Sequence, residues 1–148
     1  MNQRNKPSGI VSIRNLVMMS LLTIVLASCI PNQVEQSRSE AFKQYETIIR
    51  WSQWDAALDF IAPEYLVEHP VSRLDMDRLR LFRVTQYTIR STGVFDEGMT
   101  ARQTVVIGMF NTSQAVERTI IDDQEWRYNP TTERWQLWSP LPDPTQRY

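Results

Sequence analysis

The residue of this chain whose type and position best predict covalent chemistry is Cys29. It is the only cysteine among the 148 residues, and this excludes an intramolecular disulfide. It directly follows Ala27 and Ser28, two small residues at the end of an apolar run over residues 16–27. Three basic residues and no acidic residue precede that run. A basic leader before a short apolar run is typical of a targeting segment that is removed after export.

The apolar run at residues 16–27 is too short to cross a bilayer as a helix. Its twelve residues would rise about 18 Å, whereas the hydrocarbon core of a bilayer is about 30 Å thick. The sequence therefore favours a processed signal over a transmembrane helix.

The four residues Leu26-Ala27-Ser28-Cys29 resemble the lipobox of a bacterial lipoprotein signal. This resemblance implies that the thiol of Cys29 receives a diacylglyceryl group through a thioether. It also implies that a peptidase then cuts before Cys29, so residues 1–28 are the signal peptide. Two or three acyl chains on one residue would hold a soluble domain stably at a membrane. A plain secretory signal with an accidental cysteine is the alternative.

The residue after the cysteine bears on the location. In lipoproteins of two-membrane bacteria, an aspartate at that position commonly retains the protein at the inner membrane, and this chain has Ile30 there. The resemblance therefore implies a cell-envelope protein held at the outer membrane, facing the periplasm, with the membrane as its first partner through the lipid on Cys29.

Composition limits the remaining classes of function. Removal of residues 1–28 leaves 120 residues, enough for one domain with its own core. Their net charge is −4, because three of the 16 basic residues and none of the 17 acids lie in the signal. A nucleic-acid-binding protein would carry a basic stripe, so nucleic acid is not expected as a partner.

Few other residues have types and spacings that predict chemistry. His69 is the only histidine and lies beside Glu68. It could act as a general base, although an exposed histidine on a connecting segment is the favoured interpretation. Asp75 and Asp77 are two residues apart and would point to different sides of a helix. No catalytic residue, no cofactor site and no cofactor are therefore predicted.

One acidic cluster could offer oxygen ligands to a cation. Asp122, Asp123 and Glu125 lie within four residues, and carboxylates are the usual ligands of Ca²⁺. The segment lacks the glycine and the ligand spacing of a calcium loop. A charged turn between two strands is the favoured interpretation, so no metal site is predicted.

The first half of the mature chain predicts helices. Apolar residues at steps of three and four predict an amphipathic helix over residues 39–53, with Ser39 as its N-cap. A shorter helix is expected at 55–62, capped by Asp55 and ended by Pro63. Residues 64–71 are expected to form a connection, with a short strand at 65–67 as an option. Ser72 predicts the cap of a third helix that reaches residue 79, because Asp75 follows at capping-box spacing.

The second half predicts strands. Residues 83–90, 99–110 and 114–122 are rich in β-branched and aromatic residues and alternate in polarity. A hairpin is expected between 125–128 and 134–138, with cross-strand pairs formed by Trp126, Tyr128, Trp135 and Leu137. Prolines then end the sheet, and residues 140–148 are expected to be a loose tail. Residues 29–38 are expected to be a lipidated tether and residues 39–139 a single domain.

The five tryptophans all lie in the mature part of the chain, and filling the core of a small domain is their expected use. Trp51 and Trp54 are three residues apart at the end of the first predicted helix. Packing in the core is the favoured interpretation for both. The alternative is that one of them is exposed and belongs to a surface that binds a partner.

Helices followed by antiparallel strands predict an α+β fold, with the N-terminal helices packed on a curved antiparallel sheet. This order of elements over residues 39–139 resembles the cone-shaped NTF2-like superfamily, and the cystatin-like layout is a close alternative. The resemblance implies a pocket between helices and sheet. Because the sequence offers no catalytic constellation, we expect a non-enzymatic binding or assembly module for an envelope protein or a small apolar ligand. The alternative is a small NTF2-like enzyme of the dehydratase or isomerase type that uses His69 or an acid in a polar cavity.

The lipoprotein interpretation makes a direct prediction. We expect Cys29→Ala to abolish incorporation of a metabolic fatty-acid probe into the protein, because the thioether sulfur is lost. The measurement compares labelled wild type and variant at equal expression. Label that persists on the variant would refute this acylation site.

Overall fold

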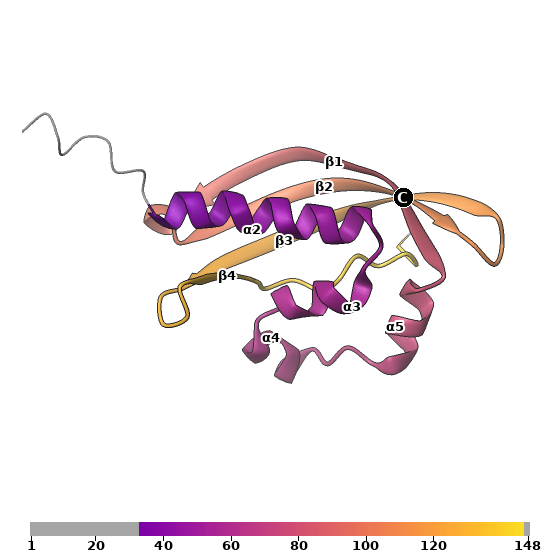
Figure 1. Ribbon diagram of the computed structural model, residues 1–148, viewed down its shortest axis with the longest axis horizontal. Coiled ribbons are helices and arrows are strands. Elements are labelled where there is room, and N and C mark those ends of the chain that lie inside the picture. The colour runs from indigo at the N-terminus through magenta and orange to yellow at the C-terminus, as the bar shows by residue number, and fades with distance from the viewer. Residues whose placement is uncertain (1–32, 147–148) are drawn as a thin grey trace, which may run out of the picture. The chain divides into compact units, whose positions relative to one another are not determined.

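The structure of the protein is a computed structural model, and it describes residues 33–146 (Figure 1). The predicted signal segment, Cys29 and the first residues of the predicted tether lie outside the described residues. The elements run in the order α2 (Gln33–Arg50), α3 (Trp54–Ala57), the 3-10 helix η1 (Leu58–Phe60), α4 (Pro63–Glu68), α5 (Arg73–Leu79), β1 (Phe82–Phe95), the 3-10 turn η2 (Asp96–Gly98), β2 (Thr100–Asn111), β3 (Val116–Asn129) and β4 (Arg134–Leu137).

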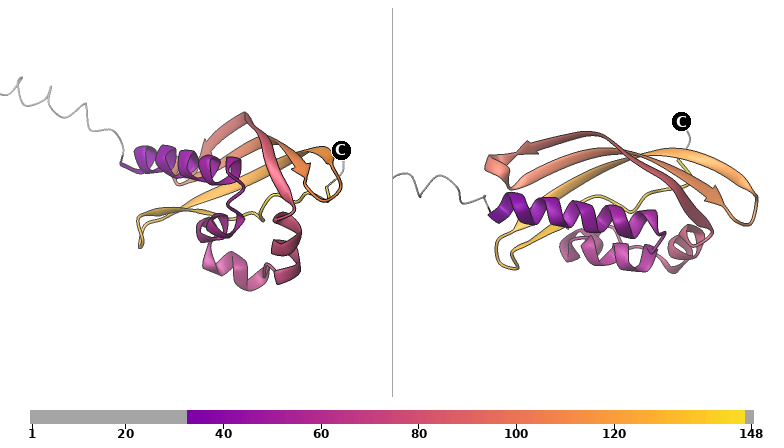
Figure 2. Two further views of the ribbon diagram at one scale, coloured as in Figure 1. Left: turned by 45° about the vertical axis from the view of Figure 1, so that its right-hand side comes forward. Right: turned by 45° about the horizontal axis from the view of Figure 1, so that its top comes forward.

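The strands of residues 33–146 form one antiparallel sheet in the order β1-β2-β3-β4. The helices pack against one face of this sheet, which curves over them (Figure 2). The predicted α+β class is therefore confirmed. Within the described part of the chain, no helix is both long enough and apolar enough to cross a membrane.

Helix α2 begins earlier than the sequence pattern predicted. It starts at Gln33, and the hydroxyl of Ser39 donates to the carbonyl oxygen of Glu35 inside the helix, 3.1 Å away. Ser39 is therefore not the N-cap. The buried stripe extends back to Val34, which packs against the core, and the carbonyl oxygen of Val34 accepts a bond from Trp135 Nε1 at 3.1 Å. This partner lies about a hundred residues away, so the local pattern could not reveal it.

The predictions for the short helices are partly wrong. Pro63 does not end a helix but opens α4, at the first position where its missing N–H costs nothing. The connection predicted at 64–71 is therefore largely helical and contains no strand at 65–67.

The two caps predicted for the short helices have different outcomes. Asp55 does not cap α3, which begins at Trp54. The Asp55 carboxylate pairs with Arg80 at 2.6 Å instead. The predicted capping box of Ser72 is confirmed at the start of α5.

Strand β3 is longer than predicted and contains no turn at its acidic residues. It runs unbroken over 14 residues, and Asp122 and Asp123 pair with Val105 and Thr104 of β2. The predicted charged turn between two strands is wrong. The strand continues because β2 offers a matching run of backbone partners. The polar groups that face inward are bound within the core, since Gln124 of the same strand donates to Asp122 and to Tyr87 of β1.

The predicted hairpin of β3 and β4 is confirmed. Trp126 pairs with Leu137, and Tyr128 pairs with Trp135. The far edge of β4 is also covered, because the N–H of Ala62 donates to the carbonyl oxygen of Leu137 at 2.9 Å. The segment before α4 thereby holds the short last strand from the other side.

Aromatic rings join the helices to the sheet around Trp126, which has no exposed surface. Its indole lies 5.1 Å from the ring of Phe42, 5.2 Å from Tyr45 and 6.1 Å from Phe60. Tilted and edge-on ring pairs at such distances add to the free energy of burial. Of the first tryptophan pair, Trp54 is buried and Trp51 is 74% exposed. The expected packing of the tryptophans in the core is therefore confirmed for Trp54 and wrong for Trp51.

The segment after β4 is packed and not loose. Leu141, Pro142 and Pro144 are buried, and the Arg118 guanidinium donates to the carbonyl oxygen of Pro144 at 3.0 Å. Proline cannot continue a sheet because it lacks an N–H. For the same reason its ring can be buried without leaving a donor unpaired, so a proline-rich segment can close over a core.

Two tryptophans provide a matched test of this core. We expect Trp126→Ala to lower the free energy of unfolding by about 3–5 kcal/mol, the usual loss for a large buried ring. Trp51→Ala should change it by no more than about 0.5 kcal/mol, because the side chain is mostly in solvent. Urea unfolding of both variants measures the difference, and equal losses would contradict the described packing.

Candidate functional site

A groove lies between the helical corner α4–α5 and the C-terminal segment 140–145. Its volume is about 370 Å³. Both walls combine apolar and polar side chains: Tyr65, His69, Pro70, Val71, Asp75, Arg78, Leu79, Pro140, Leu141, Pro142, Asp143, Pro144 and Thr145. Concave sites of this size with a few fixed polar groups are typical of ligand-binding sites.

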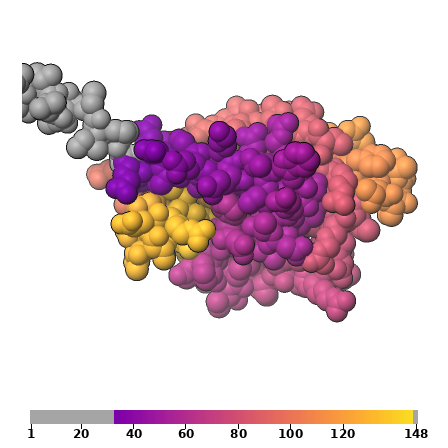
Figure 3. Space-filling view, viewed as in Figure 1, coloured from indigo at the N-terminus to yellow at the C-terminus, as the bar shows by residue number. Residues whose placement is uncertain are grey.

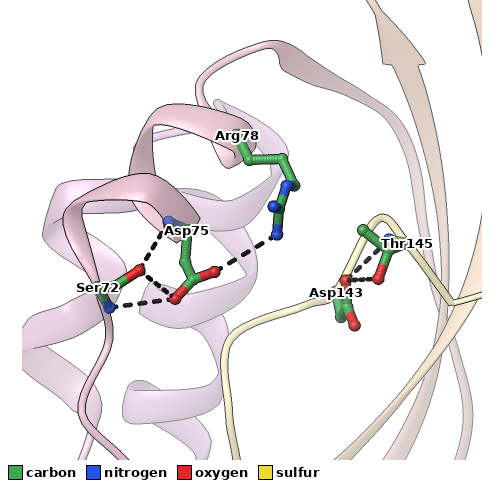
Figure 4. A network of polar contacts seen from close by, with 5 residues as sticks. All are labelled: Ser72, Asp75, Arg78, Asp143 and Thr145. Atoms are coloured by element: carbon green, nitrogen blue, oxygen red, sulfur yellow. Dashed lines mark hydrogen bonds and ion pairs between the residues drawn. The ribbon is translucent and has the colours of Figure 1, made fainter.

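The polar side chains on the α5 side of the groove are ordered by hydrogen bonds (Figure 4). The N–H of Asp75 donates to Ser72 Oγ at 3.2 Å, and Ser72 Oγ donates to Asp75 Oδ2 at 2.6 Å. Arg78 Nη1 donates to Asp75 Oδ1 at 3.4 Å. The Ser72 side chain and then its N–H hold the pKa of Asp75 below its usual value, with a smaller contribution from the Arg78 charge. Asp75 is therefore an ionised structural group.

The C-terminal side of the groove has its own fixed turn. Asp143 Oδ1 accepts the N–H of Thr145 at 2.8 Å and its hydroxyl at 2.7 Å. Figure 4 shows the Arg78 guanidinium between α5 and this turn. The contact of Arg78 with Asp75 uses one nitrogen of the guanidinium, which leaves further N–H donors for a ligand in the groove.

The sole histidine also lies in this groove. His69 is exposed and lies on the connecting segment directly after α4, as predicted. Its ring stacks on Tyr65 with a centroid distance of 4.4 Å and an interplanar angle of 16°. The two rings form a flat wall of the groove, which suits contact with an apolar or aromatic group.

A second group of polar residues is buried between α2 and the sheet. Gln124 Nε2 donates to Asp122 Oδ2 at 2.7 Å and to the Tyr87 hydroxyl at 3.2 Å. Gln124 Oε1 accepts the indole N–H of Trp126 at 3.1 Å. The hydroxyl of Tyr45 is buried without a hydrogen-bond partner among residues 33–146. Asp122 is thus a carboxylic acid in the core, held by one amide.

Burial controls the titration of this group. It raises the pKa of Asp122 to about 6, and the bond from Gln124 offsets part of that rise. Burial and the nearby Asp122 charge also raise the pKa of the Tyr45 hydroxyl. Asp122 is therefore an acid whose pKa lies near neutral pH.

The three acids proposed from the sequence as cation ligands do not converge. Asp122 faces the core, whereas Asp123 and Glu125 face the opposite side of the sheet. Asp123 accepts the hydroxyl of Thr104 at 2.7 Å, and Glu125 accepts Arg127 Nε at 2.9 Å. Within residues 33–146, no three His, Cys, Asp or Glu side chains gather into a metal-binding group.

Sequence reasoning did not find the groove, because its two walls lie more than sixty residues apart in the chain. Asp143 and the prolines of the final segment were assigned to a loose tail. The available signal was the apolar character of Leu141 and Pro142 between other prolines, since an exposed tail needs no such residues. Asp122 was also recoverable, because it shares the parity of Ile120, Gln124 and Trp126 in a continuous strand.

Comparisons with known proteins add little to this geometry. No protein-family model matches the chain, and no curated protein matches it. Among solved structures, the intermembrane space region of the chloroplast protein ARC6 is similar at 11% identity, over 67% of this chain and 92% of that one. The TM-score is 0.31, so this likeness supports no argument about function.

The buried acid makes stability depend on pH in a defined direction. Below about pH 4, Asp122 is protonated in both the folded and the unfolded chain. Between pH 4 and 6 the unfolded chain releases this proton while the folded chain keeps it, so this residue's contribution lowers the free energy of unfolding as pH rises.

We therefore expect Asp122→Asn to be more stable than wild type at pH 7, by up to about 3 kcal/mol for a shift of this size, and close to wild type at pH 4. Asp123→Asn, on the exposed face, should change this pH dependence only slightly, because the Asp123 charge makes the smallest contribution to the raised pKa of Asp122. Urea unfolding at several pH values tests this, and a constant difference between wild type and Asp122→Asn would contradict it.

Proposed function

We propose that this chain is an acylated protein of the bacterial cell envelope, and that its domain is a non-catalytic binding module. The observation that carries the anchor is Leu26-Ala27-Ser28-Cys29 after a basic and then apolar leader. Lipid on Cys29 would hold the domain at a membrane, with Ile30 favouring the outer membrane and a periplasmic domain.

The groove between α4, α5 and the C-terminal segment is the proposed binding site. Its long walls present the stacked rings of Tyr65 and His69 on one side and Leu141 and Pro142 on the other. A small apolar ligand, or apolar side chains of an envelope protein, would fit these walls. The free donors of Arg78 would bind an acceptor on the same ligand and so fix its orientation.

The state of the groove acids supports binding over catalysis. A general acid or base works best with a pKa near the working pH. The pKa of Asp75 is lowered by its bonds with Ser72, and the carboxylate of Asp143 is occupied by Thr145. Both acids thus order the site, and Asp75 holds no proton to transfer at neutral pH.

An NTF2-like enzyme is the alternative function, and the buried group around Asp122 favours it. The raised pKa of Asp122 is suited to proton transfer. The hydroxyl groups of Tyr87 and Tyr45 are buried in the same core. Asp122 is only 7% exposed and does not line the groove, so a substrate would need another route to it. For this reason we prefer the binding module.

Site-specific photo-crosslinking in living cells tests the groove. A photoreactive amino acid that replaces His69, in the groove, should crosslink to a discrete partner. The same amino acid in place of Leu74, which is 67% exposed on α5 but outside the groove, should not give that product, because the ligand contacts only the groove walls.

A second pair of changes makes this test specific. Val71→Arg places a charge on the groove wall and should remove the His69 product, whereas Leu74→Arg should leave it intact. An identical pattern at positions 69 and 74, or a product that Val71→Arg does not affect, would refute the groove as the binding site. The fatty-acid labelling of Cys29 tests the anchor separately.

A further inference from the structure

The early start of α2 leaves little chain between the proposed anchor and the folded domain. Cys29 is four residues before Gln33, the first residue of α2. Four residues span at most about 14 Å even when fully extended. Whatever their conformation, an acylated Cys29 therefore keeps the first turn of α2 close to the membrane surface. This step rests on the proposed acylation.

The first turn of α2 belongs to one end of the domain, together with two hairpins (Figures 1 and 2). Trp135 Nε1 donates to the carbonyl oxygen of Val34, and the rings of Trp135 and Tyr128 lie 5.8 Å apart. The N–H of Tyr128 in turn donates to the carbonyl oxygen of Met99 at 2.9 Å. These contacts run from the helix through the β3–β4 hairpin to the β1–β2 hairpin. We call this the anchor end.

The β1–β2 hairpin exposes apolar side chains at the anchor end. Val94 is 44% exposed, Phe95 48% and Met99 39%. The ring of Phe95 lies over Gly93, where a Cβ atom would come within 2.9 Å of it. The Arg102 guanidinium lies 5.6 Å from the centre of the same ring. An exposed aromatic ring with a cation beside it suits the boundary between headgroups and acyl chains.

Exposure alone does not select this end of the domain. Leu81, Phe110 and Val116 are exposed to similar extents at the other end of the sheet, where the β2–β3 hairpin lies. The short tether makes the choice, because β2 has 12 residues and separates the two ends by about 40 Å. Figure 3 shows the start of α2 and the β3–β4 hairpin at one edge of the view, with the β2–β3 hairpin at the opposite edge.

We infer that the anchor end lies against the lipid surface, with Val94, Phe95 and Met99 in the headgroup region of the bilayer. The carboxylates of Asp96 and Glu97 at the hairpin tip stay among the polar headgroups. The end of α5 lies at the far end, because the N–H of Thr112 beside the β2–β3 hairpin donates to the carbonyl oxygen of Leu81 at 2.9 Å. The α5 side of the groove therefore lies away from the membrane.

Depth-dependent quenching on the acylated full chain tests this orientation. Cys29 is the only cysteine and is blocked once acylated, so Glu97→Cys or Gln114→Cys supplies a single free thiol for an environment-sensitive fluorophore. Each labelled protein is placed in vesicles of phosphatidylethanolamine and phosphatidylglycerol, with or without lipid that carries a nitroxide near the headgroup. We expect loss of fluorescence from the label at 97, at the anchor end, and none from the label at 114.

Two phenylalanines provide the matched controls. Phe95→Ser should reduce quenching of the label at 97, whereas Phe110→Ser, at the far end of β2, should leave it unchanged. Circular dichroism checks that both variants are folded. Equal quenching at 97 and 114, or none at either, in protein that floats with the vesicles would overturn the orientation and leave the anchor in place. Full chain that carries no lipid and does not float would refute the proposed anchor and, with it, this inference.

Discussion

The burial of Trp126 is the interaction on which the arrangement of helices and sheet depends. This one indole contacts Phe42 and Tyr45 of α2 and Phe60 of η1, so it joins the long helix, the short helices and β3. Its N–H is bound by Gln124 of its own strand, which removes the cost of burying a donor. Because Trp126 also pairs with Leu137, the position of the last strand follows from the same contact.

The inner face of the sheet is not wholly apolar, and this has consequences for function. Gln124 binds the side chains of Asp122, Tyr87 and Trp126, so one amide satisfies most of a polar group in the core. A buried acid with a raised pKa is costly at neutral pH. Apolar packing alone does not explain why the core contains this acid. The buried acid is therefore the physical basis of the enzymatic alternative.

The binding proposal and the orientation proposal describe one arrangement. The helical corner and the proline-rich final segment enclose a groove whose acids are held by neighbouring side chains. The start of α2 and the β1–β2 hairpin lie at the other end of the long sheet. A short tether would place the second region at the lipid surface and leave the first accessible to a partner in the periplasm, so that the anchor and the groove do not compete for the same surface.

The sequence by itself determined the features that depend on neighbouring residues. The capping box of Ser72 and Asp75, the alternation along β2 and the pairs of the β3–β4 hairpin all follow from local hydrogen bonding and periodicity. The class of the fold also follows from the sequence, because predicted helices precede predicted strands in the chain. The residues that predict lipidation, Leu26-Ala27-Ser28-Cys29, are likewise a local signal, and they lie outside the described residues.

Only the tertiary structure decided the features that depend on a distant partner. Asp122 stays within a strand because β2 pairs with it, and α2 starts early because Trp135 reaches Val34. Pro142 and Pro144 are buried because the final segment packs beside the helical corner. Pro63 could end one helix or begin another by its own chemistry, and the contact of Ala62 with Leu137 accompanies the second outcome. In each case the local sequence allows two conformations that differ little in energy, and a contact with a remote segment selects one of them.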